Sequence, residues 1–454
     1  MPSNVRLPRN SLLDIKPLTR KIKTLKDVVD WGLCIGCGAC SYACSEGRVT
    51  LVNIETVGIR PRFDDDTCAG CTKCLSFCPG YSVDGDLVTR DLPRVAEADS
   101  EFGPALEIWE GHASDPEIRY RGSSGGVLSA LAAYCLEQED MAFVLHSAMD
   151  ESQPWLNATV QSRTRADIMA RTGSRYAPSS PCDGLAAVEQ SDRPCVFIGK
   201  PCDTAAVGML RQERPSLDRN LGLVLSFFCA GTPSTRGTLD LMKGMNVTPD
   251  TVTNVRYRGE GWPGEFKVAH EGGSRECSLS YDDSWGKLSR YRPLRCHLCP
   301  DGLGRVADVS CGDAWENFRG NGDPGRSIVI VRTPRGRAIV RRAMAANYVQ
   351  LTPASAQNVL AAQHNLLNKR RELFGRLAGL RLFMVPVPTF RGFALMRGWM
   401  RLSLLRKART FLGTVKRVVA RGLWRRRSWQ STEDPIVGIP KRSAAEHLET
   451  VGRR

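Results

Sequence analysis

The sequence predicts a mixed protein, α+β and α/β, in three parts: a small cysteine-rich domain, an α/β body and a helical C-terminal tail. Three observations support this fold class. Eight cysteines fall into two short runs between residues 34 and 78. From about residue 105 to 350, apolar runs that end in glycine-containing turns alternate with helical patterns. Beyond residue 351 the pattern is helical and strongly basic.

Length and composition set the outer bounds. The 454 residues are enough for two or three domains, and an apolar content of 42% supports a real core. The sequence has no recognisable export signal and no apolar run of about 18 residues, so we expect a cytoplasmic protein that does not span a membrane. In that compartment, 17 cysteines indicate metal ligation rather than disulfides.

The two cysteine runs share one spacing. Each reads C-x2-C-x2-C-x3-C, and Pro79 follows the last cysteine. In bacterial two-cluster ferredoxins, three cysteines of such a run hold one 4Fe–4S cluster and the fourth holds the other. We therefore expect one cluster on Cys34, Cys37, Cys40 and Cys78, and a second on Cys68, Cys71, Cys74 and Cys44. Zinc ribbons lack this triple run.

These runs define a ferredoxin-like domain at residues 31–90, with residues 1–30 as a lead-in. Between the runs we expect a strand at Val49–Ile54 and an acidic turn at Asp64–Asp66.

The body, residues 105–350, has α/β patterning. Gly125 and Gly126 precede an Ala/Leu-rich helix that begins at Val127. Strands are expected at Ala142–Leu145, from Cys195 into a turn at Cys202, and at Leu221–Cys229. Strand ends of this kind are where α/β proteins place cofactors.

Nine further cysteines lie in the body. Cys135, Cys195 and Cys277 are best explained by packing, because buried free cysteine is common, and Cys182 stays undecided. Four other cysteines lie in expected turns or loops and are candidate metal ligands: Cys202, Cys229 and the C-x2-C pair Cys296 and Cys299. Cys311, before a Gly-Asp turn, is a fifth. Zinc is one candidate, but a third 4Fe–4S cluster fits better beside a two-cluster domain.

Several motifs of the body then match a known family. They are Ser123–Gly126, Thr172–Pro178, Gly199–Asp203, Phe228–Gly231, Tyr257–Gly264 and Arg295–Trp315. The chain resembles the beta subunits of coenzyme F420 hydrogenases and dehydrogenases, with the ferredoxin-type extension that some members carry. Together with that extension, the resemblance covers about 300 of the 454 residues. It implies FAD and at least one 4Fe–4S cluster in the body.

The resemblance also implies site residues. Cys202, Cys229, Cys296 and Cys299 are the preferred ligands of the body cluster, and Cys311 competes for the place of Cys229. For FAD, a pyrophosphate prefers the N-terminus of a helix. The expected binding residues are Ser123, Ser124, Gly125, Gly126, Thr172, Gly173, Ser174, Arg175, Tyr176 and Lys200.

Within that set, Arg175 would pair with phosphate, Tyr176 would stack on a ring and Lys200 would tune the cofactors. The competing explanation for each is an ordinary turn or a surface ion pair. The segment Tyr257–Gly264 is either a loop over the substrate pocket or a plain β-turn. Asp308 and Asp313 are either polar supports of the site or simple caps.

We therefore expect an oxidoreductase that passes electrons between 4Fe–4S clusters and, through FAD, a hydride acceptor. Ferredoxin or another redox protein would be the electron partner, and deazaflavin coenzyme F420 or an organic substrate the acceptor. The alternative is a non-catalytic electron-transfer subunit of a larger hydrogenase or dehydrogenase complex.

The tail divides into a basic helical extension at residues 351–432 and a disordered end at 433–454. From Leu373 to Thr432 there are fourteen Lys and Arg and no Asp or Glu, against a net charge of +15 for the chain. Apolar and basic residues at helical spacing favour an anionic membrane surface or an acidic partner over nucleic acid. A solvated helix pair packed on the body is the simpler alternative.

Overall fold

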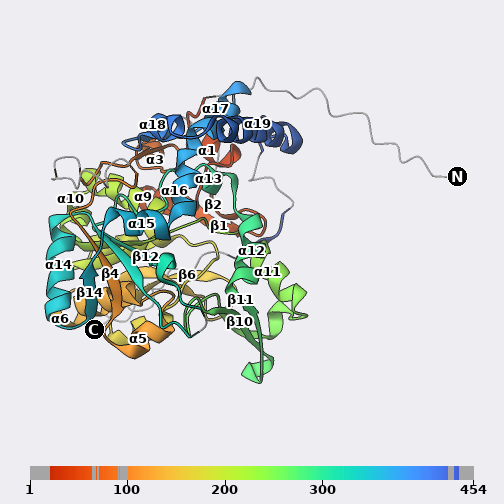
Figure 1. Cartoon of the computed structure of the whole chain (residues 1–454). Helices are drawn as coiled ribbons and strands as arrows, with labels where there is room; N and C mark the ends of the chain where they lie inside the picture. The colour runs from red at the N-terminus through yellow and green to blue at the C-terminus, as the bar shows by residue number, and fades with distance from the viewer. Residues whose placement is uncertain are drawn as a thin grey trace.

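The computed structural model describes residues 21–63, 68, 71–89, 92, 101–320, 322–427 and 434–438. An eight-stranded mixed sheet forms the centre of the body (Figure 1). Its strands run in the order β14 (Val349–Pro353), β4 (Glu107–Ala113), β13 (Ser327–Val331), β12 (Val309–Asp313), β8 (Leu221–Phe227), β7 (Cys195–Gly199), β5 (Val144–Met149) and β6 (Asn157–Ser162).

The middle of this sheet is parallel. Strand β8 pairs in parallel with β12 and β7, and β7 pairs in parallel with β5, whereas the outer pairs are antiparallel. Parallel strands are normally covered on both faces. The covering helices are α5 (Pro116–Arg121), α6 (Val127–Gln138), α7 (Arg165–Arg171), α8 (Leu185–Glu189), α9 (Pro201–Glu213), α10 (Pro215–Asn220), α14 (Pro334–Ala345) and α15 (Ala356–Ala362).

Alternate side chains of the strands point to opposite faces of the sheet, and each face is covered by its own apolar layer. Val196 and Leu223 pack with Leu131 of α6 and Val340 of α14, while Phe197 packs on the other face with α8 and α9. The expected helix from Val127 is confirmed, and the strand expected from Ala142 begins at Val144. The sequence therefore located these elements to within a few residues.

Cys202 differs from the expectation. It does not lie on a turn but in the first turn of α9, which starts at Pro201. Proline is favoured at this position because its missing N–H needs no helical partner. Asp203 also accepts a hydrogen bond from the Lys200 backbone N–H at 2.9 Å, which fixes the helix start.

The cysteine-rich domain is a β-hairpin with short helices. Its elements are α1 (Leu25–Asp30), α2 (Ala39–Ala43), β1 (Thr50–Ile54), β2 (Gly58–Arg62), α3 (Lys73–Ser76) and β3 (Ser82–Asp84). Helix α1 belongs to this domain rather than to a separate lead-in, because Val28 and Val29 are buried against Leu33. The acidic turn expected at Asp64–Asp66 lies outside the described residues.

The C-terminal extension packs on that domain. It contains α16 (His364–Arg371), α17 (Leu373–Leu382), β15 (Thr389–Arg391), α18 (Leu395–Met400) and α19 (Leu404–Arg421), and Figure 1 shows α17 and α19 above α1. Leu377 and Val418 share a core with Val28 and Leu33. Strand β15 pairs in parallel with β3, so the extension is helical with one strand inserted.

The expectation of a disordered end is wrong for Ile436–Gly438. These residues form β16, which pairs antiparallel with β1. An edge strand such as β1 presents unpaired backbone groups, and a short β-branched segment can satisfy them.

A smaller unit lies at one end of the body. Strands β9 (Val252–Arg256), β10 (Glu265–His270) and β11 (Arg275–Ser280) form an antiparallel sheet beside α11 (Thr235–Gly244) and α12 (Tyr281–Leu288), and α13 (Leu294–His297) follows. Tyr257 and Phe266 are central to its apolar cluster. None of the helices in the described ranges is long and apolar enough to cross a bilayer.

Candidate functional site

The cysteines of the two N-terminal runs gather in two crossed groups. The pKa of Cys78, from the second run, is raised by burial and then by its neighbours Cys34 and Cys37 from the first run. Conversely, burial raises the pKa of Cys74 to about 11, and the nearby Cys71, Cys44 and Cys68 contribute. The fourth cysteine of each run therefore has cysteines of the other run among its neighbours.

A third group forms in the body. Burial raises the pKa of Cys229 to about 12, with further increases from Cys296 and Cys299. The pKa of Cys202 is likewise raised by burial, with Cys299 and Cys229 among its neighbours. Cys311 is different, because burial alone raises its pKa to about 12. The structure thus brings Cys229, and not Cys311, to the other three cysteines.

The donors in each of the three groups are cysteine sulfurs. Throughout the described residues, no three Cys, His, Asp or Glu side chains converge as one metal ion would require. A zinc ion would draw its sulfurs in to about 2.3 Å from the metal, whereas a 4Fe–4S cube holds four thiolates apart at its corners. Four thiols per group match the four corners of such a cube.

Two buried arginines link the first group to the body group. Arg60, on β2, is 4% exposed, and its Nη1 donates to the Ile59 carbonyl at 2.7 Å, while its Nε has no partner among the described residues. Burial lowers the Arg60 pKa, and both Cys34 and Cys296 oppose that shift. Arg295 Nη2 donates to the carbonyl of Pro79, next to Cys78, at 2.8 Å. The sequence had indicated no role for Arg60, and Arg295 only as the first residue of the motif Arg295–Trp315.

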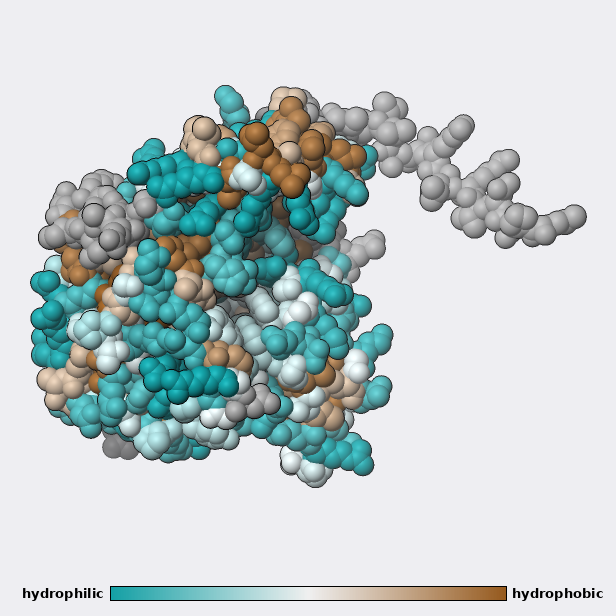
Figure 2. Space-filling model, in the orientation of Figure 1, coloured by the Kyte–Doolittle hydropathy of each residue, from teal (hydrophilic) through white to brown (hydrophobic). Residues whose placement is uncertain are grey.

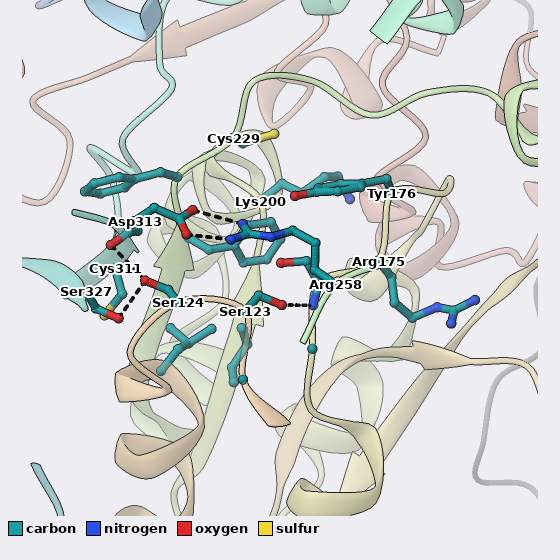
Figure 3. Close-up of a pocket in the computed structure, with 18 of the residues that line it drawn as sticks. Ser123, Ser124, Arg175, Tyr176, Lys200, Cys229, Arg258, Cys311, Asp313 and Ser327 are labelled. Atoms are coloured by element: carbon teal, nitrogen blue, oxygen red, sulfur yellow. Dashed lines mark hydrogen bonds and ion pairs between the residues drawn. The ribbon is translucent and has the colours of Figure 1, made fainter. Parts of the chain in front are cut away.

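A cavity of about 370 Å³ opens at the carboxyl ends of the parallel strands. Lys200 follows β7, Phe228 and Cys229 follow β8, and Asp313 ends β12. This is the usual position for a ligand in an α/β sheet, and the volume lies in the range of cofactor and small-molecule pockets. Cys229 belongs both to the body cysteine group and to the cavity wall (Figure 3).

Nine of the ten expected FAD-binding residues line this cavity, and Gly125 is the exception. The start of α6 forms one wall: Gly126 has a left-handed φ of 72°, and the first-turn residues Val127 to Ser129 follow it. The first N–H groups of a helix have no partner within it. Gly125 does not line the cavity, but its N–H donates at 2.9 Å to Oγ of Ser327, which does.

Arg175 does not direct its charge into the cavity. Its guanidinium donates to the side-chain oxygen of Asn157 and to the carbonyls of Val255, Pro154 and Leu156. Figure 3 shows this side chain extending away from the other labelled residues. The phosphate-pairing role expected for Arg175 has no support in this geometry, because its donors hold neighbouring backbone instead.

A second arginine does face the cavity. Arg258 forms a two-pronged ion pair with Asp313, at 3.0 and 2.7 Å, and Trp262 Nε1 donates to the same carboxylate at 2.7 Å. Although burial works to lower it, Asp313 raises the Arg258 pKa above its ordinary value. The guanidinium lies over Tyr281 and Trp315.

These contacts tie the loop Tyr257–Gly264 to the end of β12, which favours the loop-over-pocket interpretation over a free β-turn. Asp308 has a structural role, since it accepts from the Val224 N–H and from Thr333 Oγ1. Lys200 is buried and pairs with Asp203 at 2.8 Å. Burial by itself would lower the pKa of Lys200, but the neighbouring Asp203 carboxylate raises this pKa above its ordinary value. The ammonium group of Lys200 therefore stays charged.

Comparison with protein families decides the identity of this body. Models of the coenzyme F420 hydrogenase/dehydrogenase beta subunit match residues 108–186 (N-terminal part) and 192–357 (C-terminal part), and a 4Fe–4S dicluster model matches 33–81. The chain belongs to this family of beta subunits. As a beta subunit-type protein it is an iron–sulfur oxidoreductase with an N-terminal 4Fe–4S dicluster domain.

Its curated relatives are distant. The chain is 24% identical over 311 residues to one subunit of the F420H2 dehydrogenase of Methanosarcina mazei, covering 64% of this chain and 80% of the relative. It is 24% identical to the beta subunit of an F420-dependent formate dehydrogenase of Methanococcus maripaludis, covering 54% and 61%. A chain in a structure of the F420-reducing hydrogenase complex of Methanosarcina barkeri aligns with 21% identity and a TM-score of 0.49, over 65% of this chain and 98% of that one.

Proposed function

We propose that this beta subunit-type protein is an iron–sulfur flavoprotein that transfers electrons between ferredoxin and a hydride acceptor. One observation carries the proposal: Cys229 lies both in the third cysteine group and in the wall of the cavity at the sheet edge. A cluster held by that group would therefore border a cofactor in the cavity.

The cysteine groups would hold a chain of three clusters. Cys44, Cys68, Cys71 and Cys74 would hold the outer one, and Cys34, Cys37, Cys40 and Cys78 the middle one. The middle group adjoins the body group, because Arg60 is influenced by both Cys34 and Cys296. The buried positive charge of Arg60 would stabilise the reduced state of either neighbouring cluster.

The chain's own residues suit FAD in the cavity. The first turn of α6 offers N–H groups at the cavity wall, where a pyrophosphate is best received, and Ser123, Ser124 and Thr172 line the cavity beside it. Tyr281 and Trp315 also line the cavity, and their rings stack with centroids 5.5 Å apart. When bound, FAD would exchange a hydride with an organic carrier and single electrons with the clusters.

Deazaflavin coenzyme F420 is the hydride partner that the relatives favour, since the proteins named above are described as F420H2 or F420-dependent enzymes. The same descriptions favour a second candidate function, because both relatives are subunits. On that alternative the protein would transfer electrons only inside a larger complex.

Analysis of the anaerobically purified full chain tests the proposal. About twelve irons with matching acid-labile sulfide and one FAD per chain are expected. About eight irons without flavin would contradict both the body cluster and the flavoprotein assignment. Reduction of F420 by reduced ferredoxin with the chain alone would support the stand-alone enzyme, whereas turnover only after a partner subunit is added would support the second candidate.

A further inference from the structure

The outward face of α19 carries an apolar stripe. Thr410, Thr414 and Val418 turn inward and are buried. On the opposite face Leu405, Leu412 and Val419 follow one another at seven-residue intervals, and their exposed fractions are 81%, 61% and 52%. Seven residues make nearly two helical turns, so these side chains line up. A surface helix of a globular protein is normally polar on this face.

Neighbouring segments enlarge the stripe. Leu404 is 82% exposed, and Met396 and Met400 on α18 are 56% and 65% exposed. Of the thirteen large apolar side chains exposed in the described residues, eight lie between residues 382 and 419. Figure 2 shows apolar side chains gathered at this end of the molecule, over α17 to α19. A concentration of this kind marks an interaction surface rather than scattered exposure.

Basic side chains border the stripe. Arg409 and Lys416, themselves seven residues apart, are exposed next to it on α19. In the described part of the chain, ion pairs engage only four of the fourteen basic residues between Leu373 and Thr432: Arg376, Arg401, Arg406 and Arg426. The surface is therefore apolar at its centre and positive at its border, with long stems that can place the charge outward.

We propose that α18 and α19 dock on the surface of an anionic lipid bilayer. Exposed leucine and methionine would enter the boundary between headgroups and acyl chains, and the basic residues would contact anionic headgroups. Nucleic acid would match the charge but would leave the leucines in water. A second copy of the chain would cover the leucines but would oppose one positive border to another.

Helix α19 would lie between the bilayer and the part of the N-terminal domain that carries Cys34. Helix α19 packs through Val418 on the core formed by Val28 and Leu33, and Leu33 directly precedes Cys34. Docking would therefore hold the dicluster domain near the bilayer. This inference is independent of the FAD and F420 proposals, since none of the residues of the stripe lines the cavity.

Co-sedimentation of the full chain with vesicles tests the proposal. Vesicles of phosphatidylcholine with phosphatidylglycerol should carry the protein down, and vesicles of phosphatidylcholine alone should not. The double variant Leu405→Gln with Leu412→Gln should weaken binding about tenfold or more, and Arg409→Gln with Lys416→Gln should do so as well. As a matched control, Tyr120→Gln with Arg219→Gln changes an exposed ring and an exposed charge outside α18 and α19, and should leave binding unchanged.

Iron content and the visible spectrum, unchanged in all variants, would show that the fold is kept. Absence of wild-type binding to anionic vesicles would overturn the proposal. Binding that the leucine variant leaves intact would also overturn it, because adhesion would then be purely electrostatic. Self-association that the leucine variant abolishes, without vesicle binding, would assign the stripe to contact between copies instead.

Discussion

Replacement of Cys229 by alanine tests the ligand set of the body cluster. The structure groups Cys229 with Cys202, Cys296 and Cys299, while Cys311 stands apart in β12. Three groups of four cysteines correspond to about twelve irons per chain. Loss of one ligand from the third group should therefore leave about eight, with both N-terminal clusters retained.

The assay is anaerobic iron and acid-labile sulfide analysis, together with electron paramagnetic resonance of the dithionite-reduced protein. Cys311→Ala is the matched control, since it removes a buried sulfur from the next strand of the same sheet. It should keep about twelve irons and cost about 1 kcal/mol of stability through the small cavity it leaves. Loss of about four irons from Cys311→Ala and of none from Cys229→Ala would place Cys311, and not Cys229, among the cluster ligands.

Three further outcomes follow from buried charges. Arg60→Met should lower the midpoint potentials of the adjoining clusters in a redox titration by several tens of millivolts, because it removes a buried positive charge that influences both Cys34 and Cys296. Asp313→Asn should lower the thermal midpoint and release flavin, because it leaves the Arg258 charge buried without its carboxylate, at a cost of about 3 kcal/mol. Burial lowers the His146 pKa from 6.5 to about 4, so the unfolded chain takes up this proton first as pH falls. The folded state should therefore lose about 2 kcal/mol of stability between pH 7 and pH 5 on this account, and denaturation of His146→Gln should lack that loss.

Each of these three substitutions has a control at an exposed residue of the same type. Arg62→Met, two residues along β2, should leave the cluster potentials unchanged, and an equal shift in both variants would remove the special place of Arg60. Asp282→Asn, on the surface of α12, should keep flavin and thermal midpoint. His364→Gln should still lose stability between pH 7 and pH 5, because His364 is exposed. If His146→Gln showed the same loss, the loss would come from other titrating groups.

The dicluster domain could be predicted from sequence because its ligand geometry is local. Gaps of two residues wrap three cysteines around one cluster, and the crossing of Cys44 and Cys78 follows from the repeat of the spacing. The start of α6 was equally local: two glycines before an Ala/Leu-rich run predict a helix N-terminus wherever the chain folds.

The local sequence does not predict which of Arg175 and Arg258 faces the cavity. Both lie in motifs with glycine and aromatic neighbours, and either could face a cofactor. The side-chain amide of Asn157 and three backbone carbonyls hold Arg175 away from the cavity, while Asp313 holds Arg258 at its wall. These partners come from other strands and loops, so the local sequence around each arginine carries no signal of them.

By itself, the sequence determined local features: the helix that begins at Val127, the strand that begins at Cys195 and the cysteine spacing that suits iron–sulfur clusters. Tertiary structure alone decided which distant residues meet. Cys229 and Cys311 both accompany apolar strands, but β8 and β12 pair in parallel with Cys311 opposite Phe227. In that register Cys311 stays within the paired part of β12, where it lines the cavity, whereas Cys229 lies two residues beyond Phe227, past the end of β8 and near the other cysteines. The physical reason is that ligand spacing and helix caps depend on neighbours along the chain, whereas strand order and register depend on packing of the whole core.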